Sequence, residues 1–173
     1  VSAASRQSLG ISAGANLIVC LQDGDQQPGV LTAMRTISLL APRHPELHLA
    51  IVGAARQVEL RMHGAALGVN SMVSYLGART DELSVMRAAD MGWIAASGDA
   101  AALAALDFMA LRIPVIAERT PLTEHYVADA IGGILLGRAD PSATAGSVAA
   151  FVANETQRAT MANAGRARVQ REF

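Results

Sequence analysis

Six short apolar runs recur along the chain, and none shows the strict apolar–polar alternation of a strand with one solvated face. A parallel sheet that helices cover on both faces produces this pattern, because nearly every side chain of its strands is buried. We therefore predict six buried strands, at residues 16–21, 47–52, 72–76, 91–96, 114–117 and 133–136.

Segments with helical spacing of apolar residues separate these runs. The predicted helices cover residues 30–41, 57–67, 99–111, 122–130, 141–152 and 155–172, and a further helix starts at Thr80 with its hydroxyl as the N-cap. Regular alternation of strand and helix implies right-handed βαβ units. The expected fold class is α/β, with a Rossmann-like, doubly wound parallel sheet of six strands in the order 3-2-1-4-5-6.

The 173 residues suit one domain, and 51% of them are hydrophobic, which allows a substantial core. A net charge of −1 argues against a nucleic-acid partner. The one cysteine, Cys20, lies in an apolar run, where we expect a buried thiol. We find no transmembrane segment and no signal peptide, and expect a cytoplasmic protein. Because Val1 is not a methionine and Phe173 ends a helical pattern, we expect residues 1–173 to be one domain excised from a longer chain.

Lysine is absent from the sequence, and its absence excludes two kinds of chemistry. A phosphate-binding P-loop and a Schiff base both need a lysine. The dinucleotide-binding fingerprint also fails, because only Gly24 and Gly29 follow the first strand. His44 and His48 have no partner at metal-ligand spacing, so we expect no metal and no other cofactor.

The ends of the predicted strands indicate where a site would lie, because open parallel sheets bind ligands beyond the carboxyl ends of their strands. Asp99 can cap the helix after the fourth strand, and Asp107 lies two turns further on among apolar residues. A carboxylate in such surroundings needs a partner, such as the ribose hydroxyls of a nucleotide. The alternative is a helix cap and one surface acid. Trp93, in the fourth strand, is expected in the core.

Residues 88–117 carry an order of motifs that occurs in a known family. Ala-Asp90 precedes an apolar strand, Asp99 and Asp107 follow eight residues apart, and the segment ends in Pro-Val-Ile-Ala117. This order resembles the signature of the retaining, GT-B-fold glycosyltransferases of the "group 1" family, in which glutamates occupy both acidic positions. The resemblance extends to residues 49–53, 67–77 and 132–136, and so covers nearly the whole chain.

The resemblance implies a C-terminal domain that binds a nucleoside diphosphate sugar, while an N-terminal domain outside this sequence holds the acceptor. It implies that Asp99 lies near the donor sugar and that Asp107 holds the ribose. Backbone N–H groups of Ala100 and Ala101 would receive phosphate at the start of a helix. The remaining donor-binding positions are Ser97, Gly98, Gly53, Gly77, Arg79, Arg119 and Glu124, with His125 as the alternative to Glu124.

The sequence also departs from the family pattern. The family carries Gly-Arg-Leu-x-x-x-Lys-Gly after the first strand, and alignment on Gly29 puts Asp23 at the arginine and Pro28 at the lysine. Arg79 or Arg119 would have to supply the lost positive charge. Two functions therefore stay open: a donor-binding domain of an active glycosyltransferase, or a catalytically degenerate relative that serves as a scaffold or interaction module.

Overall fold

The structure of the chain is a computed structural model that describes residues 3–23, 27–53, 56–137 and 140–173. Its single sheet has six parallel strands in the order β3-β2-β1-β4-β5-β6, which confirms the predicted α/β fold and strand order. The loop with Gly24 lies outside the described residues. The strands are β1 (Asn16–Gln22), β2 (Leu47–Val52), β3 (Val73–Gly77), β4 (Met91–Ala95), β5 (Val115–Glu118) and β6 (Gly133–Leu136).

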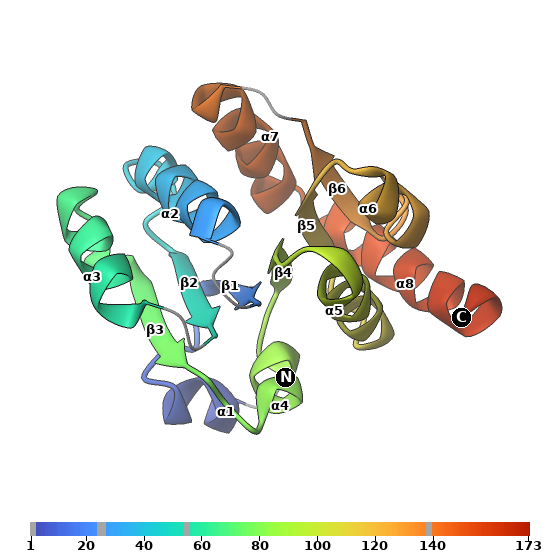
Figure 1. Cartoon of the computed structure of the whole chain (residues 1–173), viewed down its shortest axis with the longest axis horizontal. Helices are drawn as coiled ribbons and strands as arrows, with labels where there is room; N and C mark the ends of the chain where they lie inside the picture. The colour runs from blue at the N-terminus through green and yellow to red at the C-terminus, as the bar shows by residue number, and fades with distance from the viewer. Residues whose placement is uncertain (1–2, 24–26, 54–55, 138–139) are drawn as a thin grey trace.

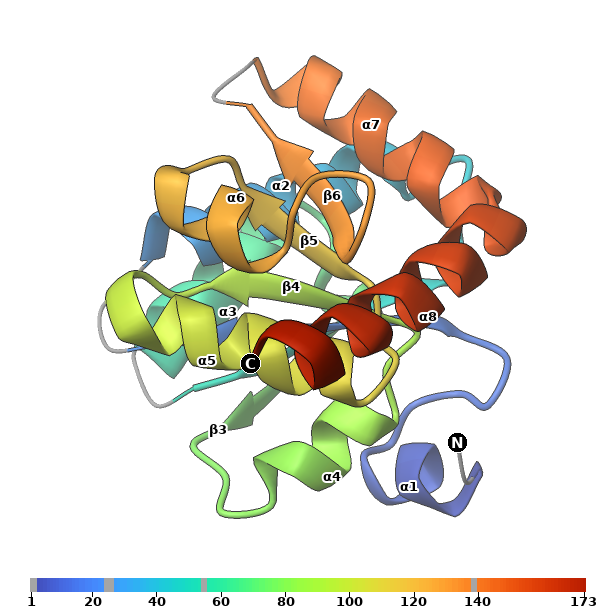
Figure 2. The same ribbon diagram turned by 90° about the vertical axis from the view of Figure 1, so that its right-hand side faces the viewer.

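Helices cover both faces of this sheet (Figures 1 and 2). Three of them, together with a short 3-10 turn before β3, pack on one face, and the others lie on the opposite face or at the ends of the strands. The first group is α2 (Gln27–Leu40), α3 (Gln57–Ala66) and α7 (Pro141–Ala153), with the turn at Asn70–Met72. The second group is α1 (Ala3–Ser8), α4 (Glu82–Arg87), α5 (Gly98–Ala110), α6 (Pro121–Tyr126) and α8 (Glu155–Glu172).

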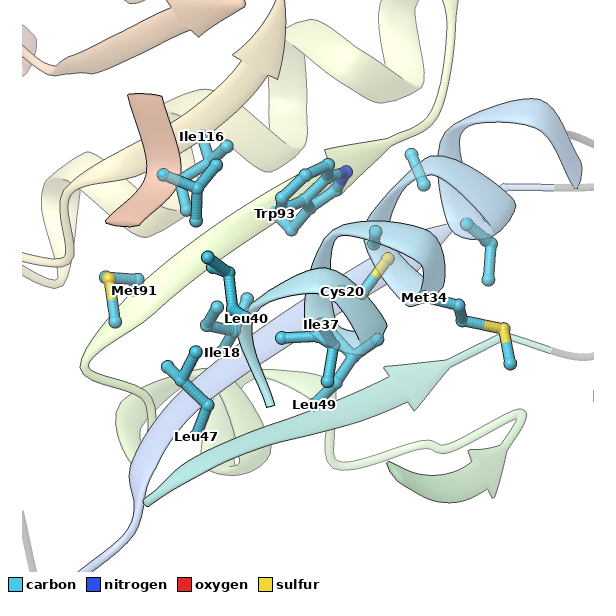
Figure 3. Packing of buried hydrophobic residues seen from close by; sticks show 14 of the residues in the cluster. Ile18, Cys20, Met34, Ile37, Leu40, Leu47, Leu49, Met91, Trp93 and Ile116 are labelled. Carbon is cyan, nitrogen blue, oxygen red and sulfur yellow. The ribbon is translucent and has the colours of Figure 1, made fainter. Parts of the chain in front are cut away.

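Strand β1 shows how the two cores form. Ile18 and Cys20 point to the face under α2, whereas Leu17 and Val19 point to the face under α5, and all four are fully buried. Figure 3 shows the first of these cores, in which α2 packs over the central strands. The prediction of a buried thiol at Cys20 is confirmed, and this burial raises its pKa far above the usual range.

Several predicted helix boundaries are wrong. Helix α2 starts at Gln27 rather than Val30. Helix α4 starts at Glu82 rather than Thr80, and the Asp81 carboxylate binds Arg79 instead of capping the helix. Helix α6 starts one residue early, because Thr120 caps it, and ends at Tyr126 rather than at residue 130. Ala128 and Ala130 have φ angles of 53° and 62°, a left-handed conformation that an α-helix cannot continue.

Arg6, on a short helix that we did not predict, ties the start of the chain to the centre of the sheet. Its guanidinium donates to the carbonyl oxygen of Ala88 at 3.0 and 2.8 Å, and to the Asp90 carboxylate at 2.9 Å. The same carboxylate accepts the backbone N–H of Leu17 at 2.7 Å. This network joins the amino ends of β1 and β4, and Arg6 is only 8% exposed within it.

We predict that Arg6→Ala lowers the free energy of unfolding by about 3 kcal/mol, because it leaves a carbonyl and a carboxylate without their charged donor. Urea denaturation followed by circular dichroism measures this change. Arg171→Ala is the matched control, since Arg171 is exposed at the end of α8 and should change stability by less than about 0.5 kcal/mol. Equal stability of the two variants would contradict the role given to Arg6.

Candidate functional site

A cavity of about 760 Å³ opens at the carboxyl edge of the sheet, where the chain order reverses between β1 and β4. Ligands of doubly wound sheets bind at this switch point, and the volume lies within the usual range for small-molecule sites. The wall combines residues from α2, β4, α5, β5, α6, β6 and α7. The residues that line it are Pro28, Gly29, Thr32, Trp93–Ser97, Gly98, Ala101, Ala117, Glu118, Thr120–Thr123, Leu136, Gly137 and Thr144.

Gly29 sets the position of the α2 wall. A Cβ atom at this glycine would lie 2.9 Å from the Ala95 Cα atom and 3.0 Å from the Ala95 Cβ atom, which is too close for any other residue. The absence of a side chain therefore lets the first turn of α2 lie directly on the end of β4. Pro28 precedes it in the same turn and has no backbone N–H to offer a ligand.

The start of α5 forms the opposite wall. Ser97 is the N-cap residue, in extended conformation, and its side chain makes no capping hydrogen bond. Gly98 follows with a φ of 56° and is the first residue of the helix. Asp99 is therefore its second residue, and the prediction that Asp99 caps the helix is wrong. Because no side chain caps this turn, its N–H groups and the positive end of the helix dipole face the mouth of the cavity.

Threonines stiffen the third wall, at the start of α6. Thr120 and Thr123 form a reciprocal capping box, in which each side chain accepts the other's backbone N–H. The Thr123 hydroxyl also donates to the carbonyl oxygen of Glu118 at 2.6 Å. These bonds fix the loop between β5 and α6, so this wall is preformed.

The two predicted acids, Asp99 and Asp107, both lie on α5 outside the cavity wall. They are exposed and stand about 12 Å apart along the helix axis. Partial burial against the helix surface raises the pKa of the Asp107 carboxyl above its usual range. Within the described part of the chain, no side-chain hydrogen bond or ion pair satisfies this carboxylate.

Gly53 and Gly77, at the ends of β2 and β3, bind each other rather than the cavity. The Gly53 N–H donates to the Gly77 carbonyl oxygen at 2.9 Å. Arg79 follows and makes a bidentate pair with Asp81, at 2.7 and 2.8 Å. The hydrogen bond with Asp81 raises the pKa of the Arg79 guanidinium, whose charge is thus matched by a carboxylate two residues away.

Arg119 is likewise matched by carboxylates of its own chain. It donates to Glu124 at 3.0 Å and makes a second, shorter bond to Asp129. These two bonds raise the pKa of the guanidinium, the Asp129 bond most of all. Because Glu124 is held in this cluster, neither of these two predicted residues reaches the cavity wall.

The structure therefore brings together part of the predicted set. Ser97, Gly98 and Ala101 line the cavity, whereas Ala100 lies half-buried beside it. The sequence analysis missed Thr32 and Thr144, because nothing in their own helices marks them as neighbours. Trp93 is buried as predicted, at 3% exposure, but it also forms part of the cavity wall.

Across residues 3–23, 27–53, 56–137 and 140–173, no three His, Cys, Asp or Glu side chains gather closely enough to hold a metal ion. Among the helices in those ranges, none is both long and apolar enough to span a membrane.

Comparison with solved structures finds the same fold in other proteins. The protein Alr3699/HepE of Anabaena, in complex with UDP and glucose, matches all of this chain with a TM-score of 0.84 at 20% identity, over 49% of its own length. The C-terminal domain of the group 1 glycosyltransferase LpcC of Francisella tularensis matches 98% of the chain and 91% of its own, with a TM-score of 0.81 at 19% identity.

Comparison with curated sequences finds a related enzyme. The D-inositol 3-phosphate glycosyltransferase of Corynebacterium jeikeium is 28% identical over 167 residues, which are 91% of this chain and 40% of that enzyme. The present chain thus spans well under half of this relative. The sequence pattern of the family described as "Glycosyl transferases group 1" matches residues 1–168. With this match over nearly its whole length, the chain belongs to the group 1 glycosyltransferases.

Proposed function

We propose that this chain binds the nucleoside diphosphate sugar donor of a glycosyltransferase. The observation that carries the proposal is the convergence of two long helices, α2 and α5, whose first turns form opposite walls of one cavity at the switch point of the sheet. Helix starts attract anions through their N–H groups and their dipoles. A diphosphate between the two helix starts would satisfy both.

The wall of α5 supplies the clearest phosphate ligands. We assign the diphosphate to the backbone N–H groups of Gly98, Asp99 and Ala100, where no side chain competes for them. The next N–H group, that of Ala101, already donates to the Ser97 carbonyl oxygen. Catalysis would then consist of holding the donor in position and stabilising the departing diphosphate. The acceptor would be held by a further domain, since relatives of this chain are about twice its length.

We assign the two acids of α5 to the parts of the donor on either side of the diphosphate. Asp99 lies at the helix start, where the donor sugar would be, and Asp107 lies two turns away along the exposed side of the helix, where a ribose would lie. A carboxylate without a protein partner is suited to accept two neighbouring ribose hydroxyls. The proposal includes no metal and no other cofactor.

A second function, a scaffold that has lost donor chemistry, is supported by the charges around the cavity. Arg79 and Arg119 are paired with carboxylates, and the described residues that line the cavity include no arginine, lysine or histidine. Gln22 ends β1 where the family has the first glycine of its strand-one loop. Among the described residues, its buried amide finds no hydrogen-bond partner, and it lies against Gly53.

We predict that the chain binds UDP, GDP or ADP saturably, with at least a tenfold preference for one of the three. Isothermal titration calorimetry on the purified chain measures the affinity. The test suits the isolated chain, because a group 1 C-terminal domain of similar extent has been solved by itself. Saturable binding supports the donor-binding function, whereas no heat with any of the three nucleotides favours the scaffold.

Asp107→Ala should weaken the binding of the preferred nucleotide about tenfold, because two charge-assisted hydrogen bonds to the ribose are lost. Calorimetry with the matching 2′,3′-dideoxynucleotide should show no difference between the variant and the parent chain. Glu155→Ala is the control, since Glu155 is an exposed acid in the first turn of α8. A loss with Asp107→Ala that persists for the dideoxynucleotide would refute the ribose assignment.

Gly29→Ala should weaken nucleotide binding and lower the free energy of unfolding by about 1–3 kcal/mol, because the new methyl group pushes the first turn of α2 off Ala95. The matched control is Gly146→Ala in α7, where a Cβ atom meets no atom within 4 Å and should stabilise the helix slightly. Thermal unfolding and calorimetry measure the two effects. Unchanged affinity in a folded Gly29→Ala variant would exclude α2 from the site.

A further inference from the structure

The floor of the cavity holds a hydrogen-bond donor for which the described part of the chain supplies no acceptor. Trp93 lies at the centre of β4, and only 3% of its surface is exposed. Its ring lies on the face under α2, between Ile116 and the core around Ile37 (Figure 3). The indole nitrogen is at the end of the ring that points along β4 toward its carboxyl end, which is the cavity side.

The indole N–H can only donate, and buried tryptophans normally find an acceptor for it. Among the described residues, no hydrogen bond satisfies the N–H of Trp93. Of the side-chain atoms that the structure describes, only atoms of Gln22 and His63 are both fully enclosed and without a hydrogen-bond partner. The indole nitrogen of Trp93 is therefore not fully enclosed. The N–H group therefore reaches the open volume of the cavity, where an oxygen atom of a ligand can accept it.

The groups around Trp93 indicate what kind of ligand this is. The Thr144 hydroxyl comes from the first turn of α7, and the Glu118 carboxylate comes from the end of β5. A hydroxyl can donate or accept, and a carboxylate accepts several bonds at once. A neutral group with many hydroxyls, such as a hexose ring, matches this mixture. A nucleobase would stack on an aromatic ring, and Trp93, the one aromatic residue among the described residues of the wall, is only 3% exposed.

We propose that Trp93 is a positioning residue for the donor sugar, whose hydroxyl oxygen accepts the indole N–H on the cavity floor. The proposal rests on the proposed function, in which the diphosphate lies at the rim between the starts of α2 and α5. From this rim, the cavity extends inward to Trp93 and Thr144. The sugar enters this inner part, while the nucleoside stays along the outside of α5.

Two paired comparisons test the proposal: UDP with UDP-glucose, and GDP with GDP-mannose. Trp93 is the only tryptophan of the chain, so its fluorescence reports on the cavity floor directly. We expect the sugar nucleotide to shift the emission and the free nucleotide to leave it nearly unchanged. In calorimetry, Trp93→Phe should weaken the sugar nucleotide about three- to tenfold and the free nucleotide less than twofold, as the loss of one hydrogen bond requires.

Because phenylalanine is smaller than tryptophan, a second replacement removes only the donor. Benzothienylalanine keeps the size of the indole but has sulfur in place of N–H, and it should reproduce the loss of sugar-nucleotide affinity. Met91→Leu is the matched control, since Met91 is buried on the same face of β4, two residues earlier, and does not line the cavity. It should leave both affinities unchanged.

The outcomes separate the two proposals. If the parent chain binds none of the four compounds and no ADP, the proposed function fails. If it binds the free nucleotides but the sugar nucleotides bind no more tightly and shift no emission, the donor-binding function stands and the role of Trp93 is overturned. Equal loss of both affinities in the benzothienylalanine chain overturns it as well, because the N–H would then act on the nucleotide. No loss of either affinity overturns it too, because a water molecule rather than the sugar would then accept the indole N–H.

Discussion

Close approach of two helices to strand β4 is the constraint on which the cavity depends. On one face, Gly29 lets the first turn of α2 lie against Ala95, and on the other, Gly92 accepts the ring of Phe108 from α5. A Cβ atom at Gly92 would lie 2.5 Å from this ring. Because interiors are close-packed, both contacts restrict how far the two helices can shift relative to β4. The two helix starts that flank the cavity are positioned by these missing side chains.

The fold could be predicted from local signals, whereas most of the cavity could not. Uniformly apolar runs and regular alternation determine a doubly wound sheet, because each signal lies within one element. The cavity depends on residues that only the fold brings together, such as Thr32 and Thr144. For Trp93, burial was predictable from the apolar run, but the direction of its N–H depends on which helices leave a gap above it. The family resemblance identified Asp99 and Asp107 of α5 as a pair, but it did not determine which groups their carboxylates contact.

Charge around the site is arranged differently from what the sequence suggested. Arg79 and Arg119 follow β3 and β5 and seemed available for an anion, yet each is held by a carboxylate close in sequence. An exposed pair of this kind contributes little to stability, but it lowers the net potential that an incoming diphosphate meets. The positive ends of α2 and α5 are then the main attraction that the described cavity wall offers to an anion.

The strand order also has a consequence for folding kinetics. Within each half of the sheet, β1 to β3 and β4 to β6, neighbouring strands follow one another in the sequence, so each half assembles through single crossovers that contain a helix. Only the pairing of β1 with β4, in which Ile18 meets Met91, closes a long segment of chain, and such closure is slow. The Arg6 network and the cavity both lie across this seam. A bound ligand would therefore hold the two halves together and slow the partial unfolding that separates them.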